Sequence, residues 1–228
     1  LLQSAAPGHD IPLNVEWIDA ARRFGNKLWN AVRFSLNHIE SGSVPKTDGY
    51  AETPGPIDAW ILSRLDVTIA EYDRLLDEYR FSDAVGLLYN FAWSEDFEWY
   101  LEMAKTLLRD EESAAATRQT LGVVMRDLLA LFHPVIPYVT EELWSELVGS
   151  GLVAASSWPT ATGATAPDGM DELQSLIVSV RRFRAEHGIS PKREIAAFID
   201  DPDGVADDWW RKQLAAMVNV NASYAGAP

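Results

Sequence analysis

The sequence of 228 residues contains no cysteine. Without thiols it can form neither disulfides nor thiolate–metal centres, so it fits a reducing compartment, which we expect to be the cytoplasm. No apolar run reaches the roughly 20 residues that a membrane-spanning helix needs, and we expect no membrane partner. The first residues do not resemble a signal peptide. Because the chain opens on Leu1, we expect a fragment of a longer protein.

Basic residues are scarce. The chain has 19 Lys and Arg against 34 Asp and Glu, for a net charge of −15. Such a chain should not attract polyanions in general, so we expect no DNA partner. The basic residues are nevertheless clustered, one group in residues 22–33 and another in residues 181–193. A local basic surface on an acidic body selects its partner better than a uniformly basic protein does.

Catalytic motifs are also missing. The four histidines are far apart, and none has a second ligand at the spacing of a metal site. There is no glycine-rich phosphate loop. Paired acids such as Glu141 and Glu142 are typical of first helical turns, where the helix dipole favours them. We therefore expect no catalytic residue, no metal site and no cofactor in this chain.

Helical spacing of apolar residues dominates the sequence. It predicts helices from Trp17 to Ile39, Pro56 to Arg80, Ser82 to Leu108, Ser113 to Phe132 and Tyr138 to Val148. These would form a helical bundle over residues 1–148, followed by a loop at 149–170. In residues 171–228 we expect a helix, a strand at 193–200, a helix after Asp207 and a second strand at 219–225 that could pair with the first. The prediction is a mainly α protein with a small C-terminal α/β appendage.

The apolar residues of the first predicted helix share one broad face, which we expect to pack on the rest of the chain: Trp17, Ile18, Ala21, Phe24, Leu28, Trp29, Ala31, Val32, Leu36 and Ile39. The opposite edge is polar and unusual, and we call it the Arg/Asn row. Its members lie at i, i+4, i+8, i+11 and i+15, on a stripe about 80° wide: Arg22, Asn26, Asn30, Arg33 and Asn37. Arg23 and Lys27 flank the row, and no acid occurs between Asp19 and Glu40. Each Asn costs roughly 0.5 kcal/mol of helix propensity, which suggests that the amides have a binding role. Arg and Asn together are suited to binding nucleic acid. The alternative interpretation, an ordinary solvated helix face, fits the pattern equally well.

Several stretches, in order and spacing, resemble one family. ARRFGNKLWNAVRF (21–34) is similar to the first helix of the anticodon-binding domain of class I valyl-tRNA synthetases. Later helices of that domain resemble DAWILSRL (58–65), YRFSDAVGLLYNFAWSEDFEWYLEMAK (79–105) and FHPVIPYVTEELWSEL (132–147). RRFRAEHGISPKREI (181–195) is similar to its C-terminal Arg-rich helix and the strand that follows. Two positions depart from the family pattern. Asp96-Phe97-Glu98-Trp99 replaces Phe-Cys-Asp-Trp, which concerns packing, and Arg22-Arg23-Phe24 replaces Arg-Asn-Phe, which adds a charge beside the row.

The resemblance implies the class I anticodon-binding helical bundle and, as partner, the anticodon stem-loop of valine tRNA. The parent would attach valine to its tRNA with ATP and Mg²⁺. Its signatures His-Ile-Gly-His and Lys-Met-Ser-Lys-Ser are not in this chain, so the resemblance implies a docking module, which we expect to be monomeric. Base or sugar contacts are expected from Arg22, Asn26, Asn30, Arg33 and Asn37, loop phosphate contacts from Arg23 and Lys27, and stem phosphate contacts from Arg181, Arg182 and Arg184.

A different class of function stays open. The chain could be a helical protein-interaction module whose basic first helix docks an acidic partner and never contacts RNA. Only charge would matter to such a partner, so it should tolerate the loss of Asn30 or Asn37. Recognition of RNA bases should be weakened by the loss of either asparagine.

Overall fold

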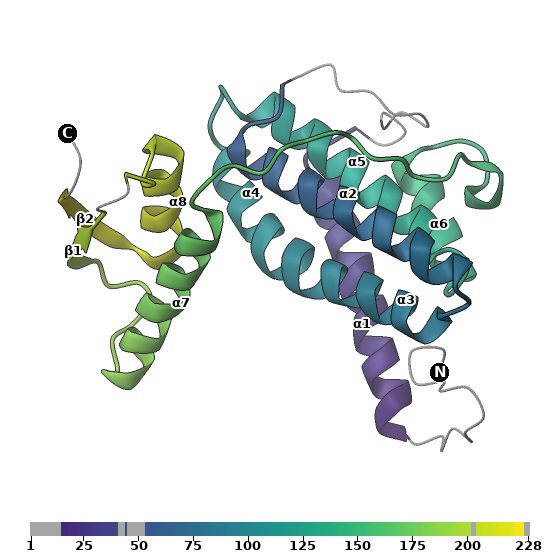
Figure 1. The fold of residues 1–228 in the computed structure, drawn as a ribbon, viewed down its shortest axis with the longest axis horizontal. Coiled ribbons are helices and arrows are strands. Elements are labelled where there is room, and N and C mark those ends of the chain that lie inside the picture. Colours follow the sequence, from purple (N-terminus) through teal and green to yellow (C-terminus); the bar gives the residue numbers. More distant parts are fainter. Residues whose placement is uncertain (1–14, 41–43, 45–52, 202–203, 226–228) are drawn as a thin grey trace. The chain divides into compact units, whose positions relative to one another are not determined.

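The computed structural model describes residues 15–40, 44, 53–201 and 204–225. The chain divides into two compact units, residues 1–165 and residues 166–228. Described residues of the first unit form helices and loops, and those of the second form helices and a small sheet (Figure 1). Among the described helices, none is long and apolar enough to cross a membrane.

The first unit is a helical bundle. Its elements are α1 (Val15–Leu36), α2 (Pro56–Asp77), α3 (Phe81–Asn90), the π-helix η2 (Phe91–Tyr100), α4 (Leu101–Leu107), α5 (Ala114–Phe132), α6 (Pro137–Leu147) and the 3₁₀ turn η3 (Val153–Ala155). The helices predicted for this unit are confirmed, with ends that differ by a few residues. Pro137 opens α6, where a proline costs no helical hydrogen bond.

Helix α5 lies at the centre of the bundle. Every residue from Thr120 to Phe132 is buried, and α1, α2, α4 and α6 all contact this helix. A helix that is covered on all sides is typical of a core element. The other helices need only one apolar face each, and their outer faces remain available for polar or charged residues.

The predicted third helix contains an irregularity that the sequence did not reveal. Between α3 and α4 the chain forms ten residues of π-helix, η2, whose hydrogen bonds run from i to i+5. The 3.6-residue period used for prediction does not describe this stretch. Asp96, one of the departures from the family pattern, is fully buried here, and neither carboxylate oxygen has a hydrogen-bond partner among the described residues. Burial raises the pKa of this carboxyl well above its usual range, so the neutral acid is favoured.

The loop after α6 packs along α2. The indole Nε1 of Trp158 donates to Asp73 at 2.8 Å, and its ring stacks on Tyr72 at 6.1 Å between centroids. Further along, the backbone amides of Thr162 and Gly163 donate to the carboxylate of Asp66 at 2.7 and 2.8 Å. These contacts hold the segment as part of the first unit up to residue 165, and the division between the units falls inside the predicted loop.

The second unit is a βαβ arrangement preceded by a helix. It consists of α7 (Met170–Glu186), β1 (Ile195–Asp200), α8 (Asp208–Val218) and β2 (Val220–Ala225). The strands pair in parallel, with Ile195 opposite Val220 and Asp200 opposite Ala225. The predicted pairing of the two strands is confirmed. Buried residues of α7 and α8 form the core of this unit, namely Leu173, Ile177, Trp210, Leu214 and Val218.

Candidate nucleic-acid interface

The central turns of α1 anchor it to the bundle. Phe24, Leu28, Ala31 and Val32 are all at most 7% exposed. The ring of Phe24 lies 4.9 Å from that of Tyr89 and 5.0 Å from that of Phe132. This side of the helix is therefore fixed by packing against α3 and α5, and its orientation decides which residues face solvent.

The predicted apolar face of α1 is only partly correct. Ile18 and Trp29 were expected on the buried side, yet their side chains are 54% and 36% exposed, and Ala21 is exposed too. The reason for Ile18 and Ala21 is length, because the N-terminal turns of α1 extend past the neighbouring helices (Figure 1). Trp29 lies in the packed part of α1, next to the buried Leu28, so the extension of the N-terminal turns does not explain its exposure.

All five members of the Arg/Asn row are exposed. No side-chain hydrogen bond or ion pair joins them to another residue that the structure describes. Their guanidinium and carboxamide groups thus present donors, and in the case of Asn also acceptors, to the solvent. The row presents five groups capable of recognition over about four helical turns.

The two flanking residues differ. Arg23 is exposed like the row itself. Lys27 is only half-exposed, because its Nζ lies 3.8 Å from the centroid of the Trp93 ring and 3.5 Å from a carboxylate oxygen of Glu98. The phosphate contact of Lys27 stays a prediction, but the lysine already has two partners within the fold that such a contact would have to replace. Both partners belong to η2, where sequence reasoning placed packing residues alone.

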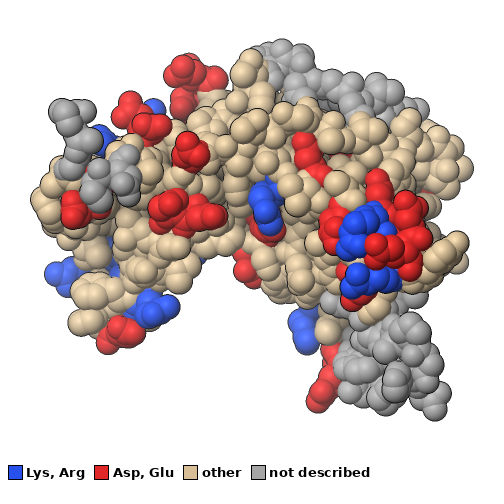
Figure 2. Space-filling model, viewed as in Figure 1, with Lys and Arg blue, Asp and Glu red and all other residues tan. Residues whose placement is uncertain are grey.

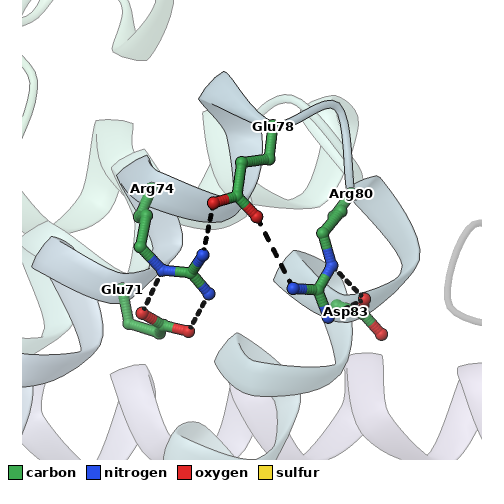
Figure 3. A network of polar contacts seen from close by, with 5 residues as sticks. All are labelled: Glu71, Arg74, Glu78, Arg80 and Asp83. Carbon is green, nitrogen blue, oxygen red and sulfur yellow. Dashed lines mark hydrogen bonds and ion pairs between the residues drawn. The ribbon is translucent and has the colours of Figure 1, made fainter.

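Arginines at the corner between α2 and α3 are arranged differently. Arg74 donates to Glu71 at 2.7 Å and to Glu78 at 2.5 Å, and Arg80 donates to Asp83 at 2.8 Å (Figure 3). On the face shown in Figure 2, the basic atoms at this corner are surrounded by acidic ones. These guanidinium groups are satisfied by their own neighbours, whereas those of Arg22 and Arg33 have no acidic partner among the described residues.

The three candidate arginines of α7 do not share one role. Arg181 and Arg182 are exposed. Arg184 is 4% exposed, and its two terminal nitrogens donate to the carbonyls of Ser190, Arg193, Val218 and Asn219 at 2.8 to 3.0 Å. The prediction that Arg184 holds phosphate is corrected, because a side chain with four internal acceptors cannot also reach a ligand outside. These hydrogen bonds connect the C-terminal turn of α7 to the segments that precede β1 and β2.

Buried polar groups elsewhere in the first unit are structural. The carboxylate of Asp58 on α2 accepts hydrogen bonds from the hydroxyls of Tyr100 at 2.7 Å and Thr117 at 2.9 Å. Burial raises its pKa to about 6, although these two hydrogen bonds act in the opposite direction. Asp58 thereby joins α2 to η2 and α5 from the inside. The described residues include no group of three or more His, Asp and Glu side chains that could hold a metal ion.

Comparison with known proteins identifies the family of this chain. Residues 58–199 match the family described as the anticodon-binding domain of tRNA ligase. The chain is 40% identical over 203 residues to a valine–tRNA ligase of Streptomyces avermitilis, covering 86% of this chain and 23% of the relative. It is 38% identical over 227 residues to that of Nocardia farcinica, covering 96% and 25%. The chain thus spans about a quarter of the length of these relatives.

A solved structure shows the same fold. The LeuRS–tRNA–LeuAMS ternary complex of Agrobacterium radiobacter matches 81% of this chain and 24% of the compared chain, with a TM-score of 0.54 and 16% identity. At this identity the likeness concerns the fold alone. The family match, in contrast, extends over most of the chain, from α2 to β1. The chain belongs to the anticodon-binding domain family of tRNA ligases.

Proposed function

We propose that this chain is the part of a valine–tRNA ligase that binds the anticodon stem-loop of valine tRNA. The parent would attach valine to this tRNA with ATP and Mg²⁺, and the present residues would supply docking and no catalytic step. Support comes from the family match and from the names of the relatives, which are valine–tRNA ligases.

The exposed Arg/Asn row carries the proposal. Proteins that read RNA sequence generally bind unstacked loop bases, whose edges can accept or donate hydrogen bonds. Valine anticodons have an invariant A in the middle and C at the third position. The carboxamide of Asn can pair with an adenine edge in two hydrogen bonds, and the guanidinium of Arg supplies donors to base acceptors or phosphate. Asn30 and Arg33 lie close together on the row and are both exposed.

Phosphate contacts are assigned to the exposed arginines outside the row. Arg23 adjoins it on α1, and Arg181 and Arg182 belong to α7 in the second unit. The net charge of −15 limits non-specific attraction, so these few contacts should position the RNA without attracting every polyanion. Specificity would come from the Arg/Asn row, and affinity from the row together with the exposed arginines outside it.

The direct test compares two RNA hairpins that differ in one base. The chain should bind a valine anticodon stem-loop about 5- to 150-fold more tightly than the same hairpin with its middle A replaced, since one lost base contact costs about 1–3 kcal/mol. Asn30→Ala should reduce this preference. Asn90→Ala, a matched change at an exposed asparagine on α3, should not. Binding would be measured by fluorescence anisotropy at fixed salt.

The competing hypothesis, a basic helix that docks an acidic protein, predicts another outcome. Both hairpins would bind equally weakly, and Asn30→Ala would change neither. That result would reject base recognition by α1.

A further inference from the structure

Trp29 is an exposed aromatic residue beside the Arg/Asn row on α1. At 100° per residue it lies about 20° from Arg22 and 40° from Arg33 around the helix, so it belongs to the same edge. Sequence periodicity alone assigned it to the apolar face. Its side chain is 36% exposed, whereas Leu28 and Val32, the buried residues beside it on α1, are fully covered.

The indole of Trp29 differs from that of Trp93, which makes contacts within the fold. The ring of Trp93 stacks on Tyr89 at 5.7 Å and is covered on a face by Lys27. For Trp29, the structure shows no ring stacking and no cation–π contact with any described residue. The exposed part of Trp29, 36% of the residue, therefore lies beside the guanidinium groups of the row with no aromatic or cationic partner among the described residues.

We propose that Trp29 is the stacking platform for one unpaired base of the RNA that binds along the Arg/Asn row. The proposal rests on the proposed function and extends it, because it assigns a residue that holds the face of a base where the row reads its edge. Single-stranded RNA is commonly bound in this way, with loop bases turned out and stacked on aromatic rings.

The helix geometry places edge-reading groups around the platform. Asn26 lies three residues before Trp29 and Arg33 four residues after it, so each is within about one turn of the ring, or roughly 5 to 6 Å along the axis. A base stacked on the indole would have its polar edge directed toward one of these side chains. Stacking is tolerant of base identity, since every base has a π face, and the Asn and Arg groups would supply the discrimination.

The test replaces the ring while keeping bulk. Trp29→Leu should weaken binding of a valine anticodon stem-loop about 5- to 150-fold, the range expected for loss of one stacked base. Trp29→Phe keeps an aromatic face and should retain most of the affinity. Tyr138→Leu on α6 is the matched control, since that ring is 93% exposed and lies outside α1, and should leave binding unchanged.

Two further measurements separate stacking from a structural role. First, hairpins with an abasic site at each loop position in turn should reveal one position at which wild type and Trp29→Leu bind equally. Second, 2-aminopurine at that position should be quenched on binding to wild type and to Trp29→Phe. The proposal would be overturned if Trp29→Leu lost the same affinity on every abasic hairpin, if it lost no affinity at all, or if no loop position showed quenching. If Trp29→Leu fails to fold, the fluorescence quenching with the wild-type chain still tests the proposal.

Failure of this inference is distinguishable from failure of the proposed function. If wild type discriminates the valine anticodon and Asn30→Ala reduces the preference, while Trp29→Leu has no effect, only the stacking role is rejected. In that case RNA binding would depend on the row alone.

Discussion

Arg33 of α1 and Arg184 of α7 both belong to basic clusters of the sequence, yet the structure uses them in opposite ways. Arg33 on α1 is exposed among amides, with no acidic partner among the described residues. Arg184 on α7 is buried, and its two terminal nitrogens donate to four backbone carbonyls. The difference teaches that clustering of cations does not identify a binding surface. The acceptors around each guanidinium decide whether it serves the fold or a partner.

Removing the buried arginine should have the largest effect. Arg184→Ala leaves four carbonyls without their donor, and hydrogen bonds to a charged group are worth about 1.5–3 kcal/mol each, so a loss of about 3 kcal/mol or more in the free energy of unfolding is expected. The exposed neighbour Arg182→Ala should cost no more than about 0.5 kcal/mol. Urea unfolding followed by hydrogen exchange in residues 170–225 would measure both. Equal stability of the two variants would contradict the structural role of Arg184.

Asp58 extends the comparison to a buried acid that has hydroxyl partners and a raised pKa. Its pKa is about 6 in the folded chain against an ordinary value of 3.8, so folding favours the protonated form. The stability that this acid contributes is full below about pH 4, falls as pH rises to about 6 and is constant above. A shift of this size corresponds to about 3 kcal/mol.

Asp58→Asn removes the titration and isolates this effect. The free energy of unfolding of wild type minus that of the variant should therefore decrease by up to about 3 kcal/mol between pH 4 and pH 7, as measured by urea melts. The contribution of Asp96 cancels because both proteins carry it. A difference that rises with pH would mean that the carboxylate of Asp58 is stabilised by the fold rather than opposed by burial.

Arg33 should show the reverse pattern, with a cost in binding and little cost in stability. Arg33→Ala is expected to weaken binding of a valine anticodon stem-loop by about 1–3 kcal/mol and to change the free energy of unfolding by no more than about 0.5 kcal/mol. The loss should shrink for a hairpin whose middle A or third C has been changed, because the contact is then already absent. A double-mutant cycle of side chain against base, with thermal melts, measures both quantities. If the variant weakens every hairpin alike, Arg33 acts through charge alone.

Much of the fold could be predicted because it follows from regular periodicity. The helix from Ser113 to Phe132 and the pairing of two strands around an intervening helix are both confirmed. What failed depends on three-dimensional surroundings. The π-helix η2 departs from the 3.6-residue period, and the exposure of Ile18 depends on where neighbouring helices end.

The candidate site divides in the same way. The exposure of the Arg/Asn row could be inferred from α1 alone, since its members share one edge. The engagement of Lys27 could not, because Trp93 and Glu98 come from a helix about 70 residues away in sequence. Trp29 was misassigned because an angle near the border of two faces does not say how much of a large ring its neighbours cover.

Salt dependence gives a finer comparison between two cations of α1. Each phosphate contact with single-stranded nucleic acid contributes about −0.7 to the slope of log K against log salt concentration. Arg23→Ala should flatten the slope by roughly this amount, whereas Lys27→Ala should change it less, because Glu98 and the Trp93 ring already hold the lysine. Anisotropy titrations at four or five salt concentrations would resolve the difference. A larger change for Lys27→Ala would mean that the lysine leaves these partners to contact the RNA.

The smallest effect is expected at the corner between α2 and α3, where the arginines are enclosed by acids (Figure 3). Arg80→Ala removes an exposed cation that is paired with Asp83 and Glu78. Because exposed ion pairs are screened by water and salt, stability should change little, and less at high salt. RNA affinity should change less than twofold, because Arg80 lies outside α1 and its charge is already paired with Asp83 and Glu78. If Arg80→Ala weakened binding as much as Arg33→Ala, any exposed arginine of this chain would serve RNA equally, and the distinction between partnered and open guanidinium groups would not hold.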